Sequence, residues 1–236
     1  PDVARVAMLR GAFEYQGQKC SAASRAYVAK SVWDRIKDQL IADTESLEMG
    51  DVTDLSNFMG AVIDDRAFAK HKKAIARVRA NKHLTLLAGG QTDDSVGWFV
   101  RPTIVQSSDP TDQMFSTEYF GPILAVHVYP DDRFERVVAQ MESFAPYALT
   151  GAIIAQDRAA IDWASRELRF AAGNFYVNDK PTGAVVGQQP FGGARASGTN
   201  DKAGAAVNLL RWTSPRSIKE TFVPPKDFRY PHMESE

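Results

Sequence analysis

The single cysteine of this sequence, Cys20, belongs to a residue type that forms covalent intermediates in enzymes. A thiolate adds readily to carbonyl carbon, but a thiol with the ordinary pKa of ~8.5 is only a few per cent ionised at neutral pH. Lys19 precedes Cys20 and Ser21 follows it, and a neighbouring ammonium favours the thiolate. These residues leave two interpretations open: an exposed nucleophile, or the inert packing residue that free cysteines commonly are.

The four histidines are the next candidates, either as metal ligands or as a base for the thiol. They are His71, His83, His127 and His232, and none forms a two-ligand helical pair with another histidine or with Cys20. Their scatter predicts no metal site. Each histidine is more simply a surface or core imidazole. A cysteine hydrolase stays an alternative if folding brings a histidine to the thiol.

Two glycine-containing loops have the composition of ligand-binding segments. Glu118–Pro122 combines a carboxylate, aromatic rings and a Gly-Pro turn, which by itself is typical of the entry into a strand. Glycines crowd the chain beyond Asn178, as they do where backbone turns sharply or approaches a ligand closely. The spacing in Gly187–Gly198 does not match G-x-G-x-x-G, and the chain has no Walker A pattern. We expect the site after Asn178, without a phosphate-binding fingerprint in this chain.

The elements that must position these residues alternate between helix and strand. Apolar residues recur at three- and four-residue steps in the predicted helices, and the predicted strands are β-branched or aromatic runs bounded by turn residues. We expect helices at 2–15, 31–42, 68–79, 131–142 and 157–169 and strands at 25–28, 84–88, 99–105, 123–129, 150–155 and 174–177. This alternation predicts an α/β fold with an open, mostly parallel sheet flanked by helices.

The composition is that of an ordinary globular protein, with 44% hydrophobic and 24% charged residues. The 28 Lys and Arg residues against 29 Asp and Glu leave a formal net charge of -1, so no global field favours nucleic acid or an anionic membrane. No apolar stretch approaches the ~20 residues of a membrane span. We therefore expect no nucleic-acid and no membrane partner, and the lone cysteine fits a reducing compartment.

The two ends of the sequence carry their own predictions. The chain opens at Pro1 with no initiator methionine and no signal-peptide pattern, which favours a fragment of a longer protein. Near the other end, Ser217–Val223 alternates between polar and apolar residues as a strand does. An exposed edge strand invites pairing with another copy of the chain.

Three motifs in this order resemble the aldehyde dehydrogenase superfamily: Gln18–Ser21, Glu118–Pro122 and Pro190–Asn200. Their flanks, Phe13–Ala22 and Gly187–Asp201, are similar to one branch, whose members oxidise L-glutamate γ-semialdehyde to L-glutamate with NAD in proline catabolism. The likeness covers nearly the whole chain, with the last dozen residues uncertain. It implies that this chain is the C-terminal catalytic domain.

The resemblance implies a role for three residues of the reaction centre. Cys20 is expected to be the nucleophile that forms a thiohemiacetal and then a thioester, with its backbone NH steadying the oxyanion. Glu118 matches the glutamate that accepts hydrogen bonds from the nicotinamide ribose. Phe120 matches the residue beside the nicotinamide ring. NAD is the cofactor that the resemblance implies.

The resemblance also implies a set of substrate-binding residues. The backbone NH groups of Gly183 and Ala184 are expected to hold the α-carboxylate, with Ser21 nearby and Phe191 against the aliphatic part. Ala184 departs from members that carry Ser here, so one hydroxyl contact is absent. Lys19 adds charge attraction for the carboxylate, or is a simple surface lysine.

The implied domain organisation divides the chain at residue 205. Residues 1–205 correspond to the catalytic domain and 206–236 to a C-terminal oligomerisation strand and tail. The strand is expected at Ser214–Val223 and pairs across a subunit boundary, so a homo-oligomer is expected. The family's NAD-binding domain, general-base glutamate and oxyanion-binding asparagine correspond to sequence upstream of Pro1. We therefore expect this chain alone to be inactive. The cytoplasm is the expected location, with the mitochondrial matrix as the alternative.

Two other classes of function remain alternatives at the level of sequence. A cysteine hydrolase or esterase would acylate Cys20 without NAD and would need a nearby histidine. A non-enzymatic assembly module would use its glycines for turns and would bury Cys20 as a packing residue. Slow, pH-independent alkylation of the thiol would favour the assembly module.

Overall fold

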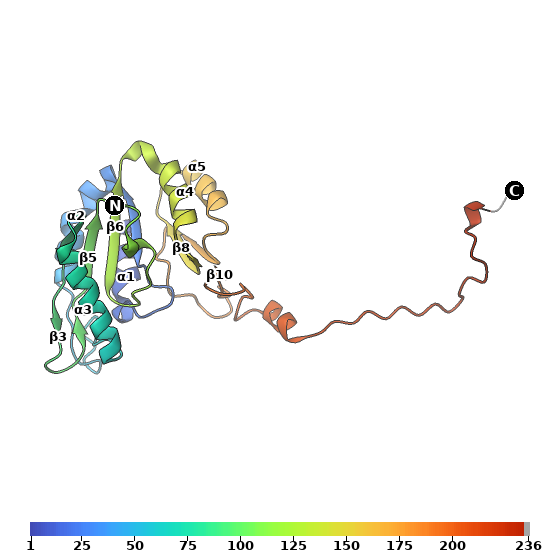
Figure 1. Cartoon of the computed structure of the whole chain (residues 1–236), viewed down its shortest axis with the longest axis horizontal. Helices are drawn as coiled ribbons and strands as arrows, with labels where there is room; N and C mark the ends of the chain where they lie inside the picture. The colour runs from blue at the N-terminus through green and yellow to red at the C-terminus, as the bar shows by residue number, and fades with distance from the viewer. Residues whose placement is uncertain (234–236) are drawn as a thin grey trace.

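A four-stranded sheet forms the centre of the computed structural model, which describes residues 1–233 (Figure 1). The strand order is β1 (Arg25–Ala29), β6 (Ile123–Tyr129), β5 (Thr103–Ser107) and β2 (Leu84–Ala88). β1, β6 and β5 are parallel, and β2 runs antiparallel to β5. The first four residues of β6 are all buried, as expected of a parallel strand covered on both faces.

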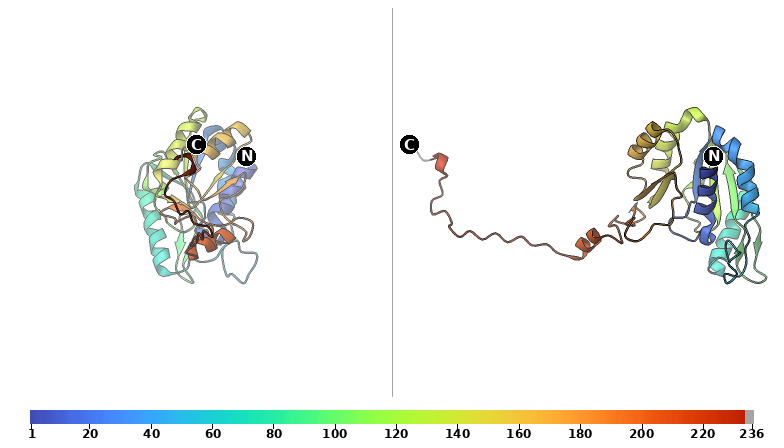
Figure 2. Two further views of the ribbon diagram at one scale, coloured as in Figure 1. Left: turned by 90° about the vertical axis from the view of Figure 1, so that its right-hand side faces the viewer. Right: turned by 180° about the vertical axis from the view of Figure 1, so that it is seen from behind.

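Helices cover both faces of this sheet because side chains alternate along its strands. Ile123 and Ala125 face a cluster with the apolar stripe of α3 (Asp65–Ala80). Leu124 and Val126 face the opposite cluster, which contains residues of α1 and α2. The bounds of these two helices are Asp2–Phe13 and Lys30–Glu45. Figures 1 and 2 show α3 on one side of the sheet and α1 and α2 on the other.

A second, smaller lobe contains a separate pair of parallel strands. β8 (Thr150–Ile153) pairs with β9 (Asn174–Val177), and α4 (Phe134–Phe144) and α5 (Arg158–Glu167) pack beside them. Phe134 of α4 contacts Trp163 of α5, with ring centroids 5.7 Å apart. The mostly parallel arrangement is confirmed. The strands are nevertheless divided between this pair and the four-stranded sheet.

Short elements connect these parts. Two antiparallel pairs are formed by strands of two residues, and five single-turn or short 3-10 helices lie between or after the longer elements. The strands are β3 (Thr92–Asp93) with β4 (Phe99–Val100) and β7 (Tyr147–Ala148) with β10 (Ala194–Arg195). The 3-10 helices are η1 (Glu14–Gly17), η2 (Gln113–Phe115), η3 (Asp131–Arg133), η4 (Ala206–Trp212) and η5 (Pro231–Met233).

Three expected elements differ from the structure. The helix expected to reach residue 15 ends at Phe13, because Tyr15 and Gln16 have left-handed φ angles of 54° and 57°. The strand expected at 99–105 is two strands, separated by Arg101 and Pro102, and a proline cannot donate to a strand ladder. The strand expected at 214–223 is not formed in the single chain, where no ladder forms in that segment.

The last part of the described chain leaves the folded body as an extended segment (Figures 1 and 2). Residues 209–233 are exposed throughout, including the large side chains of Trp212, Phe222 and Phe228. A strand exists only where a second strand lies alongside, and the single chain supplies none to this segment. Its pairing with another subunit stays a prediction. The predictions for residues 234–236 lie outside the described residues.

None of the helices described in residues 1–233 has the length and apolar character needed to cross a membrane.

Candidate functional site

The loop that carries Cys20 is shaped by an abrupt end of α1. Phe13 is fully buried at the last turn of that helix. Tyr15, Gln16 and Gly17 then take left-handed backbone angles, and a Cβ on Gly17 would overlap the backbone of Ala12 and Gly121. The chain therefore reverses tightly, and Cys20 emerges exposed at the surface. An inert, buried cysteine is excluded by this placement.

Ser21 fastens the Cys20 loop to a distant part of the chain. Its hydroxyl donates a 2.8 Å hydrogen bond to Oγ1 of Thr182, and both residues are buried. Thr182 precedes Gly183, the first residue expected to bind a substrate carboxylate. The backbone oxygen of Ser21 also accepts a hydrogen bond from Thr150 at the start of β8, at 3.4 Å. Ser21 thus joins the loop that carries Cys20 to the glycine-rich segment after Asn178.

Lys19, which precedes Cys20, belongs to a small cluster of charged side chains. Its ammonium lies 3.1 Å from Oε2 of Glu14, and the ammonium of Lys180 donates to the same carboxylate at 2.6 and 2.7 Å. Burial raises the pKa of Glu14, but hydrogen bonds and charge from Lys180 and Lys19 outweigh it and hold the pKa below its usual value. Glu14 is therefore a carboxylate at neutral pH.

Glu118 and Phe120 belong to the loop that precedes β6. Both side chains are exposed, whereas Tyr119 between them is buried. Phe120 has a left-handed φ of 55°, which turns its ring away from the direction a regular strand entry would give. An exposed carboxylate next to an exposed ring suits a ligand that carries hydroxyl groups and a flat heterocycle. These two residues would hold the ribose and ring of a nicotinamide nucleotide.

His71 of α3 contacts the backbone of this loop. Its Nε2 atom lies 3.1 Å from the carbonyl oxygen of Tyr119 and must donate, because a carbonyl oxygen only accepts. A Cβ on Gly121 would overlap the imidazole. Burial lowers the pKa of His71, with backbone hydrogen bonds opposing the shift. The sequence signal for this role was the place of His71 on the buried stripe with Phe68 and Ile75.

The Cys20 loop and the loop before β6 both line a cavity of about 140 Å³. Lys19, Cys20, Glu118 and Phe120 all line it. Arg25 also lines it and donates from Nη1 to the backbone oxygen of Phe115 at 3.1 Å. No histidine of residues 1–233 lines this cavity. A cysteine hydrolase with a histidine base therefore has no support in the described part of the chain.

The remaining predicted substrate residues lie outside that cavity. Gly183 is exposed with a φ of 90°, and Ala184 beside it is half-buried. Phe191 is also half-buried and exchanges two backbone hydrogen bonds of 2.8 Å with Ala203. Thr182, next to Gly183, connects this segment to the Cys20 loop through its bond with Ser21. The sequence did not predict the contacts made by three residues at these loops: Lys180, Thr182 and His71.

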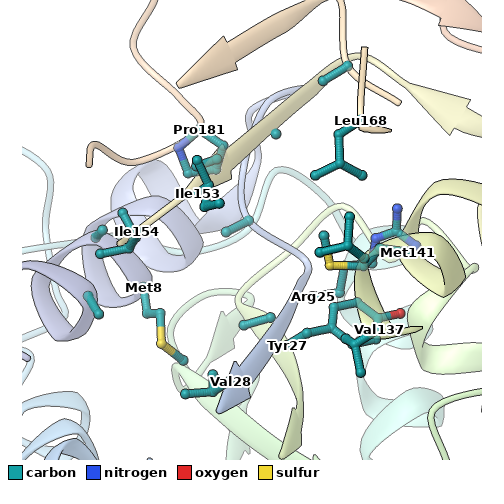
Figure 3. A pocket seen from close by; sticks show the side chains of 18 of the residues that line it. Met8, Arg25, Tyr27, Val28, Val137, Met141, Ile153, Ile154, Leu168 and Pro181 are labelled. Atoms are coloured by element: carbon teal, nitrogen blue, oxygen red, sulfur yellow. The ribbon is translucent and has the colours of Figure 1, made fainter. Parts of the chain in front are cut away.

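A larger cavity, about 320 Å³, lies between the edges of β1 and β8 (Figure 3). Its walls are mostly apolar and include Met8, Val28, Val137 and Ile153. It contains neither the cysteine nor a histidine. Covalent chemistry on a carbonyl needs a nucleophile, so the smaller cavity beside Cys20 is the candidate active site.

Comparison with known proteins shows where these features recur. The profile of the Aldehyde dehydrogenase family matches residues 2–218. The chain is 54% identical over 225 residues to "Delta-1-pyrroline-5-carboxylate dehydrogenase, mitochondrial" of Dictyostelium discoideum, covering 95% of this chain and 40% of that protein. It is 52% identical over 227 residues to the Homo sapiens protein of the same name, covering 96% of this chain and 40% of that protein.

A solved relative has the same fold over the whole chain. The crystal structure of the Delta-pyrroline-5-carboxylate dehydrogenase from Mycobacterium tuberculosis bound with NAD aligns with a TM-score of 0.86 and 60% identity. The alignment covers 100% of this chain and 43% of that one. The present chain therefore spans about 40% of the length of the relatives it matches.

Proposed function

Because this chain belongs to the aldehyde dehydrogenase family, we propose that it is the thiol-bearing part of an enzyme that oxidises L-glutamate γ-semialdehyde to L-glutamate with NAD. The observation that carries the proposal is the meeting of an exposed Cys20 with Glu118 and Phe120 around one cavity. The relatives named for Δ1-pyrroline-5-carboxylate, the cyclic form of the same aldehyde, support this substrate.

Cys20 performs the covalent part of the proposed reaction. Its thiolate attacks the aldehyde carbon, and the carbonyl electron pair moves to oxygen to give a thiohemiacetal alkoxide. The backbone NH of Cys20 stabilises this oxyanion by a hydrogen bond. Collapse of the alkoxide expels a hydride and leaves a thioester. Water then attacks the thioester carbon, releases L-glutamate and returns the thiol.

NAD, when bound, supplies the acceptor for that hydride. Glu118 would accept hydrogen bonds from ribose hydroxyls, and Phe120 would lie beside the nicotinamide ring. His71 keeps this loop in place through its hydrogen bond to the Tyr119 carbonyl and its contact with Gly121. The residues present therefore fit the cofactor, although Gly187–Gly198 is not a dinucleotide fingerprint.

Substrate binding is assigned to the loop after Thr182. The backbone NH groups of Gly183 and Ala184 would hold the α-carboxylate, and Phe191 would contact the aliphatic carbons. Ser21 acts by fixing this loop, since its hydroxyl already donates to Thr182. Lys19 adds positive charge beside the thiol, partly balanced by Glu14.

The proposed complete enzyme is a homo-oligomer in which residues 206–233 contact another subunit. This segment exposes Trp212, Ile218 and Phe222, and apolar side chains on an extended segment are stabilised by burial. Light scattering of the complete enzyme at micromolar concentration should give a multiple of the subunit mass. The cytoplasm is the proposed location, and the mitochondrial relatives keep the matrix as the alternative.

The test is an assay of the complete enzyme with Δ1-pyrroline-5-carboxylate and NAD. NADH should form, and Cys20→Ala should abolish it without altering the unfolding curve. The 236-residue chain alone should form no NADH. A Cys20→Ala enzyme that retains turnover would refute the proposed nucleophile. NADH formation by the isolated chain would refute the need for further residues.

A further inference from the structure

Three charged side chains lie where the loop that carries Cys20 meets the glycine-rich segment after Asn178. The carboxylate of Glu14 contacts both the ammonium of Lys19 and the ammonium of Lys180. The exposed fractions of these side chains are 22% for Glu14, 34% for Lys19 and 23% for Lys180. Partly buried charges interact more strongly than surface pairs, because water and salt screen them less.

Lys180 is positioned by close packing as well as by charge. A Cβ on Gly11 of α1 would lie 3.6 Å from Cβ of Lys180 and 3.2 Å from Cδ of Pro181. The absence of a side chain at Gly11 therefore lets this segment rest against the helix. The other end of the lysine reaches the site, since a Cβ on Gly183 would lie 3.7 Å from its Cε and 3.9 Å from its Nζ.

The cluster has an excess of positive charge. Two ammonium groups face one carboxylate, so a charge of +1 remains at the point where the loops of Cys20 and Gly183 meet. Glu14 is ionised, because the two lysines hold its pKa low despite its burial. A single acidic residue therefore fixes both lysines but neutralises only one of them.

We propose that Lys180, held in place by Glu14, is a specificity-determining cation that favours substrates carrying a carboxylate. The identity of that substrate rests on the proposed function. Lys180 is separated from Cys20 by 160 positions in the sequence, yet its ammonium lies beside Gly183 and shares a carboxylate with Lys19. Glu14 is a positioning residue, because it acts by orienting the two lysines.

The single cysteine permits a test that needs neither NAD nor turnover. The 236-residue chain is alkylated with iodoacetate and, separately, with iodoacetamide, and the ratio of the two rate constants is measured. Both reagents react with the same thiolate, so changes in thiol ionisation cancel. The ratio therefore reports the electrostatic potential that a small carboxylate meets at Cys20.

Removal of the cation should lower this ratio. Lys180→Met is expected to reduce it about three- to tenfold, the order expected for one partly screened unit charge. Lys180→Arg should keep it near the unmodified value, because the charge remains. In a Glu14→Gln background, Lys180→Met should change the ratio less, because the lysine is no longer held beside the site. Lys73→Met, which removes an exposed lysine on α3, is the matched control and should leave the ratio unchanged.

The outcomes separate this inference from the proposed function. Equal ratios for the unmodified chain and Lys180→Met, with circular dichroism unchanged, would overturn it. If Lys180→Met fails to fold, Lys180→Gln, which also removes the charge but keeps a polar side chain, takes its place in the comparison. If the alkylation ratios change as expected but the complete enzyme makes no NADH, only the dehydrogenase proposal is refuted. If the complete enzyme makes NADH but the alkylation ratio is the same in every variant, only the role of Lys180 is refuted.

Discussion

The sheet lobe that carries Cys20 and the glycine-rich segment after Asn178 are held in place in different ways. The lobe is fixed by strand ladders and by two buried apolar clusters on either side of β6. Between residues 179 and 205 the segment forms a two-residue strand, β10, and an isolated bridge between Phe191 and Ala203. Its residues with left-handed φ include Gly183, Gly187, Arg195, Gly198, Asn200, Lys202 and Gly204.

The segment depends instead on a few side-chain contacts to both lobes. Thr182 accepts from Ser21, and Lys180 donates to Glu14. Asn174, in β9 of the smaller lobe, binds the segment at two points, donating to Pro190 O at 3.1 Å and accepting from Gly192 N at 3.2 Å. The lobe that carries Cys20 is thus held by extensive packing, and the loop proposed to bind the substrate is placed by individual bonds. Changes in the lobe should affect the whole fold, and changes in the contacts should affect mainly the site.

The largest loss of stability is expected from Leu124→Ala in β6. Leu124 is fully buried in the cluster with α1 and α2, and truncating a buried leucine costs about 2–5 kcal/mol. Urea unfolding followed by circular dichroism measures the change. Leu55→Ala, at a residue 94% exposed, is the control and should stay within about 0.5 kcal/mol. Similar values for the two variants would remove the contrast between core and surface.

Gly121→Ala should cost less and should act on the cofactor loop. The added methyl overlaps the His71 imidazole, and overpacking of a core costs about 1–3 kcal/mol. The double variant with His71→Ala should recover part of that loss, because it vacates the occupied space. Unfolding curves of the two single variants and the double variant measure the coupling. Additive losses would contradict a direct contact between these residues.

Thr182→Val should have an intermediate effect concentrated on the substrate loop. It removes the acceptor for the buried Ser21 hydroxyl, and an unsatisfied buried donor costs about 1–3 kcal/mol. Adding Ser21→Ala removes the donor too and should restore most of the stability. In the complete enzyme, both variants should raise KM more than they lower kcat. A double variant less stable than Thr182→Val would contradict the proposed bond.

The smallest effect is expected from the titration of His71. Burial lowers its pKa in the folded state, so below pH ~6.5 the unfolded chain binds a proton that the folded chain does not. Stability should therefore fall with decreasing pH from that point until the folded pKa is reached, by at most about 1.4 kcal/mol per pH unit. His71→Gln should flatten this part of the profile. His83→Gln, at an exposed histidine, should not, and parallel profiles for all three proteins would count against the prediction.

Local sequence patterns predicted the regular elements well. The strands at Leu84–Ala88, Ile123–Tyr129 and Asn174–Val177 are confirmed at their predicted bounds, because each is a short run of strand-forming residues bounded by turn residues. The early end of α1 was not predictable, since it depends on left-handed angles at two residues other than glycine. A strand at 214–223 could not be decided from one chain, because strand formation requires a partner.

The parts of the candidate site that depend on long-range contacts could not be predicted from the sequence. The motifs identified Cys20 and Glu118, and the structure places both around one cavity. Their catalytic roles stay predictions. No local pattern joins Glu14 to Lys180, which are 166 positions apart, or Ser21 to Thr182. Such pairs depend on the folded path of the chain, which brings α1 beside the segment after β9.

The most direct test of the account is protection of Cys20 by the aldehyde in the absence of NAD. The 236-residue chain is labelled with iodoacetamide with and without Δ1-pyrroline-5-carboxylate, and the extent is read by intact mass. Formation of a thiohemiacetal should slow labelling in proportion to the aldehyde concentration, and the urea-unfolded chain should show less protection. Labelling that is equally fast at every concentration would contradict the assignment of Cys20 as the residue that captures the substrate.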